Sequence, residues 1–171
     1  MPKTKSLVRS LSRRGVRSDM SPPVGGVGKT RQREPAACER CGATYVRRTW
    51  RRDRAVTHDL LTRATWTVCP ACRQAGSGEY WGRVLVRGAF VPAHESDIRR
   101  RISNVAERAA RSQPLRRVLA IDRRSDGLEV LTTSQKLAHR IVHELKKLYR
   151  GRAHYCWSDD GSLFATWQRE R

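Results

Sequence analysis

The stretch CERCGATYVRRTWRRDR, residues 38–54, opens with a C-x-x-C turn, and the stretch CPACR, residues 69–73, repeats that turn. Two thiolates at this spacing fit one edge of a tetrahedral Zn²⁺ site, and a second such turn completes it. Gly42 suits the tight turn that follows Cys41. The sequence therefore predicts a four-thiolate zinc site formed by Cys38, Cys41, Cys69 and Cys72, with reduced structural cysteines or a redox pair as the alternatives.

The segment between the two turns is longer than usual and is rich in arginine. Guanidinium groups bind phosphates, and an indole stacks on an unpaired base. The alternative is a solvated charged loop whose tryptophan covers the small zinc core. The RNA-binding residues expected in this segment are Arg47, Arg48, Trp50, Arg51, Arg52 and Arg54.

The charge of the whole chain supports a polyanionic partner. Among its 171 residues, 36 are Lys or Arg and 16 are Asp or Glu, which gives a net charge of +20. Of the cations, 30 are arginines, a preference typical of nucleic-acid binding but also of a GC-rich genome. The chain has no apolar run of membrane-spanning length. Its five cysteines are sparse and odd in number, whereas a secreted disulfide scaffold has many cysteines in pairs. We therefore expect a cytoplasmic protein with no membrane partner.

Changes in composition predict three sections. Residues 1–34 are basic and contain Ser, Gly and Pro without apolar periodicity, so we expect a disordered basic arm. Residues 35–79 form the zinc ribbon. Residues 80–171 have the composition of a folded α+β domain, here predicted to bind RNA.

The third section reads as strand, helix, strand, strand, helix, strand, strand. The first six elements match the split βαβ, or ferredoxin-like, arrangement, and an extra C-terminal strand follows. A helix opened by Pro92 keeps one apolar face and ends before Pro114. The second helix is expected to begin with a capping box from Thr132 to Gln135 and to end at a left-handed Gly151. The predicted fold class is therefore α+β, a zinc ribbon followed by a ferredoxin-like domain.

The second helix has an apolar stripe and, on the opposite side, a basic row. The apolar stripe consists of Leu137, Ala138, Ile141, Val142, Leu145, Leu148 and Tyr149. A solvated helix face is the alternative to a binding surface, but Glu144 is the one acid available for pairing within this helix. The basic row consists of Lys136, Arg140, His143, Lys147 and Arg150.

The last two strands, 153–157 and 163–167, flank a hairpin turn at Ser158-Asp159-Asp160-Gly161. Their aromatic residues Tyr155, Trp157 and Trp167 are candidates for stacking bases on an open sheet face, with core packing as the alternative. Cys156 is expected to be a buried reduced thiol.

The order of motifs resembles an uncharacterised bacterial family of zinc-ribbon proteins, which in turn distantly resembles the adaptor that exports large ribosomal subunits. The resemblance rests on the paired knuckles, on the segment LTTSQKLA at residues 131–138 and on Tyr149-Arg150-Gly151, and it covers roughly residues 35–171. It implies a setting of rRNA or ribosome binding.

The resulting functional hypothesis is a non-enzymatic zinc protein that binds RNA, with rRNA or the ribosome as the expected target. A DNA-binding regulator or nucleoid-associated protein is the alternative, although no helix-turn-helix spacing is evident. An enzyme is not expected, because four thiolates close the metal site and no paired carboxylates suggest two-metal chemistry. A glycine-rich stretch at 25–30 ends like a phosphate-binding loop, but Pro23 stands where that loop needs a glycine. We therefore expect no small-molecule substrate.

Overall fold

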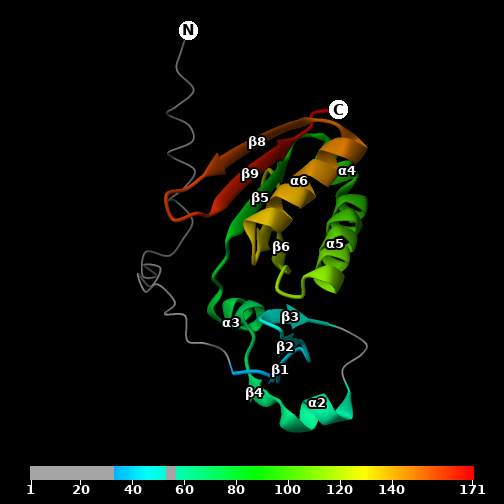
Figure 1. Ribbon diagram of the computed structural model, residues 1–171. Coiled ribbons are helices and arrows are strands. Elements are labelled where there is room, and N and C mark those ends of the chain that lie inside the picture. Colours follow the sequence, from blue (N-terminus) through cyan, green and yellow to red (C-terminus); the bar gives the residue numbers. More distant parts are fainter. Residues whose placement is uncertain (1–32, 53–56) are drawn as a thin grey trace. The chain divides into compact units, whose positions relative to one another are not determined.

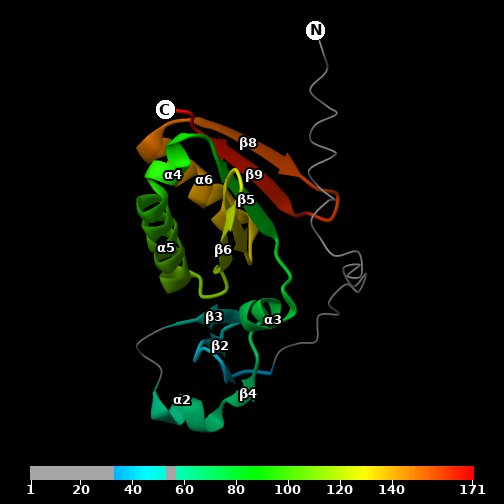
Figure 2. The same cartoon turned by 180° about the vertical axis from the view of Figure 1, so that it is seen from behind.

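The computed structural model describes residues 33–52 and 57–171, so the predicted arm and Arg54 lie outside the described residues, apart from Arg33 and Glu34. Residues 33–171 form one compact unit, which contains two mixed sheets and, among the described residues, five helices (Figures 1 and 2). None of the helices in the described ranges combines the length and apolarity needed to cross a bilayer.

The N-terminal sheet is built from four three-residue strands in the order β3-β2-β1-β4. β1 pairs antiparallel with β2 and parallel with β4, and β2 pairs antiparallel with β3. Helix α2 (His58–Arg63) precedes β4, and helix α3 (Pro70–Ser77) follows it. The strands are β1 (Ala36–Cys38), β2 (Thr44–Val46), β3 (Thr49–Arg51) and β4 (Thr65–Thr67).

The C-terminal sheet has five strands in the order β6-β7-β5-β9-β8. All neighbouring pairs are antiparallel except β5 and β9, which run parallel. The strands are β5 (Gly82–Arg87), β6 (Val118–Arg124), β7 (Gly127–Thr132), β8 (Arg152–Trp157) and β9 (Leu163–Gln168).

Along the chain, the strands and the two long helices follow one another as predicted. Across the sheet, however, the strand order differs from that of a four-stranded ferredoxin-like sheet. In that sheet, the strand after the second helix would pair directly with the first strand. Here the strand after the second helix is β8, but β5 pairs with β9 instead, and β8 pairs with β9 at the edge of the sheet. The last strand is therefore inserted into the sheet rather than added to its edge.

Helices α5 (Glu95–Ser112) and α6 (Gln135–Tyr149) cover one face of this sheet (Figures 1 and 2). The predicted apolar face of the first helix is confirmed, since Ile98, Ile102, Val105 and Ala109 are all buried. The helix begins later than expected, because Pro92 lies in the separate short helix α4 (Phe90–Ala93).

The ends of α6 correct one expectation and confirm another. Ser134, not Thr132, is the N-cap, and its side chain accepts a hydrogen bond from the backbone N–H of Leu137. The Thr132 hydroxyl instead lies 2.9 Å from the carbonyl of Ser134. Gly151 has the predicted positive φ, 84°, and follows Arg150, which also has a positive φ.

The core between the helices and the sheet contains most of the predicted α6 stripe. Leu137, Ile141 and Leu145 are fully buried and Tyr149 packs against the core, whereas Leu148 is exposed. Trp167 on β9 is also fully buried in this core.

Candidate functional site

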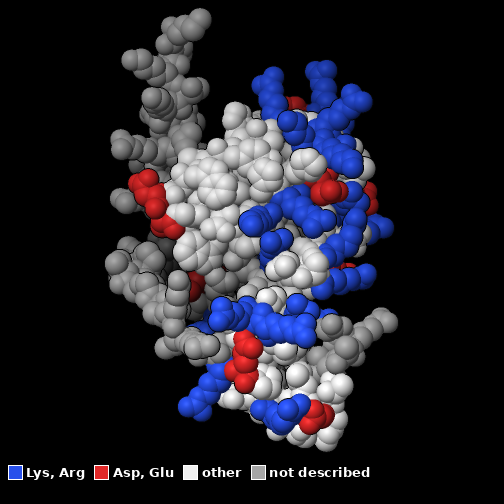
Figure 3. All heavy atoms as spheres, viewed as in Figure 1, with Lys and Arg blue, Asp and Glu red and all other residues white. Residues whose placement is uncertain are grey.

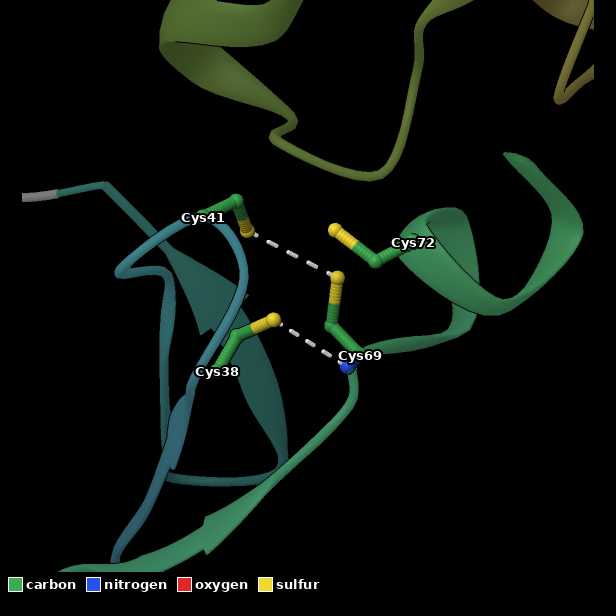
Figure 4. A group of neighbouring side chains, drawn as sticks. All are labelled: Cys38, Cys41, Cys69 and Cys72. Carbon is green, nitrogen blue, oxygen red and sulfur yellow. Dashed lines mark hydrogen bonds between the residues drawn. The ribbon is translucent and has the colours of Figure 1, made fainter. Parts of the chain in front are cut away.

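Four cysteines come together at the start of α3. Cys38 ends β1 and Cys41 lies in the turn after it, while Cys69 is the N-cap of α3 and Cys72 lies in its first turn. Their sulfur atoms all lie within 4.8 Å of one another and point toward a common centre (Figure 4). The Sγ atoms of Cys41 and Cys69 are 3.7 Å apart, so they are not bonded to each other.

The backbone around the first turn is arranged to stabilise a thiolate. Burial favours the neutral thiol of Cys38, but backbone N–H groups of Cys69, Arg40 and Cys41 donate to its sulfur and lower its pKa to about 6. The turn closes through Gly42, with φ 68°, whose N–H donates to the carbonyl of Cys38 at 2.8 Å. These are the local features that the C-x-x-C-G pattern predicts.

In the second pair of cysteines, burial outweighs the contacts that stabilise a thiolate, namely the backbone N–H of Cys72 for Cys69 and the Cys69 sulfur for Cys72. Burial raises the pKa values of Cys69 and Cys72, and Cys38 and Cys41 of the first pair raise them further. Four thiolates this close repel one another, so a bound divalent cation is what allows all four to lose their protons.

The sulfur positions fit a metal ion. A tetrahedral zinc ion with Zn–S bonds of about 2.3 Å requires sulfur–sulfur separations of about 3.8 Å, which is close to the separation of Cys41 and Cys69. The predicted clustering of Cys38, Cys41, Cys69 and Cys72 is therefore confirmed, and these residues could bind a metal ion. Cys156 lies apart, on β8, as a free thiol that is half-buried rather than buried as expected.

A loop from the C-terminal sheet contacts the cysteine cluster. The guanidinium Nη1 of Arg117 lies 3.5 Å from the Cys72 sulfur, and Leu115 packs against the buried residues around the cluster. The loop is held by Thr133, whose hydroxyl donates to the carbonyl of Leu115 at 2.6 Å and accepts from the N–H of Arg117 at 2.8 Å. The cluster is thus linked to Thr133, which directly precedes the N-cap of α6.

Trp50 is part of this cluster's core rather than a surface platform. Its side chain is 7% exposed and packs with Cys38 and Cys69, and its ring centroid lies 5.4 Å from that of Tyr45. The expectation that Trp50 stacks on an unpaired base is therefore wrong for this structure. Its β3 position alternates with the exposed Thr49 and Arg51, which is the pleat of a strand with one buried face.

Two of the predicted arginines form the tip of the β2–β3 hairpin. Arg47 and Arg48 are the two loop residues, and both have positive φ, 51° and 60°. This conformation is the signature of a type I′ turn, in which Asn-Gly is the preferred sequence. Both arginines are exposed, and the backbone N–H of Arg48 donates to a Glu34 carboxylate oxygen at 2.7 Å. The turn therefore displays two adjacent cations at a conformational cost.

The neighbouring arginines of this segment differ in their contacts. Arg51 is exposed on β3. Arg52 is also exposed, but its Nη2 donates to the carbonyl of Cys41 at 3.0 Å, next to the cysteine cluster.

The predicted basic row of α6 is exposed along its whole length. Lysines and arginines gather over α5 and α6 on the face shown in Figure 3. The two helices differ in how many of those charges are balanced: among the described ion pairs, three of the five α5 arginines pair with acids, and Arg108 and Arg111 do not. In α5, Arg99 pairs with Glu95, Arg100 with Asp97, and Arg101 with Glu144 of α6. No ion pair within the described residues involves the α6 cations, namely Lys136, Arg140, Lys146, Lys147 and Arg150.

The aromatic residues of the C-terminal hairpin do not lie on the open sheet face. Trp167 is fully buried under the helices, which confirms core packing rather than base stacking for this ring. Tyr155 and Trp157 pair with Ala165 and Leu163, which belong to the same core, so they too project toward the helix side. Both nonetheless remain exposed, because β8 is the edge strand.

The sequence did not predict two of the contacts, those made by Arg117 and by His139. Arg117 approaches Cys72 across 45 residues of chain, and no local pattern indicates that contact. His139 stacks on Tyr155, with ring centroids 4.8 Å apart. Its spacing from Lys136 and His143, three and four residues, was a usable signal that it shares their face.

Comparison with models of known protein families and with curated protein sequences finds no match to this chain.

Proposed function

We propose that this protein is a non-enzymatic RNA-binding protein of the cytoplasm, associated with rRNA or the ribosome, in which a structural zinc ion holds the N-terminal sheet together. The observation that carries the proposal is the contrast between the two helices. The α5 arginines nearest its start are neutralised by acids, whereas the exposed cations of α6 have no ion-pair partner among the described residues. A row of uncompensated cations on a rigid helix is suited to a phosphate backbone.

The strained hairpin tip supports the same interface class. A non-glycine residue in the left-handed region costs about 1–2 kcal/mol, and Arg47 and Arg48 both adopt it. Arginine supplies bidentate phosphate binding that Asn-Gly, the stable choice for the turn, cannot supply. Exposed arginines at this cost are consistent with binding to a polyanion.

Zinc is the metal that best suits the site. Soft thiolate ligands in a tetrahedral set select zinc or an iron–sulfur cluster, and the chain places four sulfurs around a single centre rather than around the larger volume of a cluster. A site with four protein ligands leaves no coordination position for substrate, which supports a structural role. When bound, the ion supplies folding energy.

RNA is favoured over DNA by the shape of the basic elements. The cations lie along one exposed helix and on a short hairpin, and RNA is recognised mainly through backbone contacts and unpaired loops. The order of motifs resembles a bacterial zinc-ribbon family that in turn distantly resembles the ribosomal large-subunit export adaptor, and this resemblance supports a ribosomal RNA target. The ferredoxin-like relationship of the C-terminal sheet remains part of this proposal, since β6, β7 and β5 have the expected order.

The test is a pair of triple variants with the same change in net charge. Lys136→Gln/Arg140→Gln/Lys147→Gln removes cations that have no ion-pair partner. The control, Arg63→Gln/Arg100→Gln/Arg123→Gln, removes cations that are exposed but ion-paired. Each phosphate contact contributes about 0.7–0.9 to the slope of log K against log salt, so the α6 variant should lose about 2–3 from the slope for a structured rRNA fragment. The control should lose little.

Equal losses for the two variants would show that only net charge matters and would reject α6 as the interface. Ribosome association is tested separately by sucrose-gradient sedimentation of cell extract. The protein should co-migrate with a ribosomal subunit, and RNase but not DNase should release it. Release by DNase alone would favour a nucleoid-associated role instead.

A further inference from the structure

The edge strand β8 presents two exposed aromatic rings beside α6. Tyr155 is 39% exposed and Trp157 is 61% exposed. They are two residues apart, so both project from the same face of the strand, about 7 Å from each other along it. Their strand partners, Ala165 and Leu163, are buried, which shows that this is the helix-covered face. We refer to Tyr155 and Trp157 as the β8 aromatic pair.

Helix α6 continues this surface with cationic and aromatic groups. His139 stacks on Tyr155 at a centroid distance of 4.8 Å and an interplanar angle of 27°. Lys136 and His143 precede and follow His139 by three and four residues, so they lie on the same side of the helix. All three side chains are exposed. Aromatic faces and cations therefore adjoin one another where β8 meets α6.

The β8 aromatic pair contributes little to the core. Trp167 fills the core from the adjacent strand and is fully buried, whereas most of the Trp157 side chain contacts solvent. An exposed indole adds little to folding and promotes association, so a surface that carries one next to a tyrosine points to a ligand with flat apolar faces.

We propose that the β8 aromatic pair, with the adjoining face of α6, binds unpaired nucleotides of RNA. The proposal rests on the RNA-binding function proposed above and specifies its ligand as single-stranded. Bases stack on Tyr155 and Trp157, as every base offers a π-face, and the backbone phosphates lie toward Lys136 on α6. The β8–β9 turn carries Asp159 and Asp160, which repel phosphate, and it contacts the start of α6 through Gln135, so the RNA backbone leaves the site away from this turn, along α6 toward His143.

Single-stranded RNA is the form that this surface can distinguish. Bases in a duplex are stacked on one another and present only their edges, so exposed rings gain no stacking contact from them. Cations alone would bind both forms. The aromatic pair is therefore expected to discriminate between them, and the basic row is not.

The experiment uses the full zinc-loaded chain with Tyr155→Ala and Trp157→Ala, singly and together, and with Tyr155→Phe and Trp157→Phe as controls that keep a ring. Binding is measured to an unstructured oligouridine and to an RNA duplex of the same length. Each alanine substitution should weaken oligouridine binding by about 5- to 140-fold, and the salt slope and duplex affinity should stay unchanged. The phenylalanine variants should retain most of the affinity.

The outcomes separate this proposal from the one on which it rests. If the unmodified chain binds neither RNA, the RNA-binding function itself is rejected. If it binds RNA but the alanine variants bind oligouridine normally, only the stacking site is overturned; this result is also expected if the natural ligand of β8 is a peptide that adds a strand to the sheet. The stacking site is likewise overturned if the alanine variants lose duplex and oligouridine affinity equally. A melting temperature is recorded for each variant, and because Trp157 is the more exposed ring, Trp157→Ala alone decides the question if the Tyr155 variant is unstable.

Discussion

Replacing Arg47-Arg48 with Asn-Gly should stabilise the protein and at the same time weaken its binding to RNA. Both residues have positive φ in the β2–β3 turn, and each costs about 1–2 kcal/mol in that conformation. Glycine removes nearly all of this cost and asparagine part of it, while glycine adds an entropic cost of about 0.5–1 kcal/mol in the unfolded chain. The net gain is then about 1–2 kcal/mol, or a melting temperature higher by roughly 3–8 °C for a unit of this size.

The substitution leaves the other contacts of the turn intact. The bond to Glu34 comes from the backbone N–H of Arg48, which glycine retains. The loss of two phosphate-binding groups should lower the salt slope of RNA binding by about 1.4–1.8. Thermal unfolding and RNA binding at a series of salt concentrations, measured on the same preparation, report both effects.

Arg47→Lys/Arg48→Lys is the matched control, since it keeps the charge and the strained backbone and should change both quantities little. An Asn-Gly variant that melts at or below the temperature of the unmodified chain would refute the strain argument. A stabilised variant with an unchanged salt slope would remove the hairpin tip from the interface.

Three further results are expected. Elemental analysis should find one zinc per chain, which Cys69→Ser should abolish and Cys156→Ser should leave unchanged, because only the former contributes to the cluster. Arg117→Met should weaken zinc binding about 10- to 100-fold in a chelator competition, because its guanidinium donates to a cluster sulfur; unchanged affinity would reject that contact. Glu129 is buried, which favours its neutral form, but two arginines bind it and lower its pKa, so its ion pairs stabilise the fold above the ordinary glutamate pKa. Chemical denaturation should show that Glu129→Gln costs about 2 kcal/mol at pH 7, the typical value of hydrogen bonds to a charged group. This difference should shrink below about pH 4.3 and vanish as the pH falls through the lowered pKa. A pH-independent difference would contradict the ion-pair explanation.

The sequence determined the local parts of this protein. The C-x-x-C spacing and Gly42 predicted the cysteine cluster, because a knuckle is formed by a few consecutive residues whose backbone bonds are local. Apolar spacing predicted the buried face of α5 and most of that of α6, because helical periodicity is also a local property. The exposed basic row of α6 followed from the same periodicity.

Only the tertiary structure decided which strand lies beside β5. Both β8 and β9 have alternating residues and either satisfies the pattern of a strand. Pairing β9 with β5 buries Leu163, Ala165 and Trp167 under α6, and that choice depends on burial summed over distant residues rather than on either strand's own sequence.

The same limit explains the aromatic residues and the metal-centre contact. Trp50 and Trp157 both lie on short strands, yet the first is buried against the cysteines and the second is exposed at a sheet edge. Arg117 reaches Cys72 only because the loop before β6 is folded back and held by Thr133. Non-local packing decides which aromatic ring is buried and which cation contacts a sulfur, and the local pattern of the sequence does not contain that information.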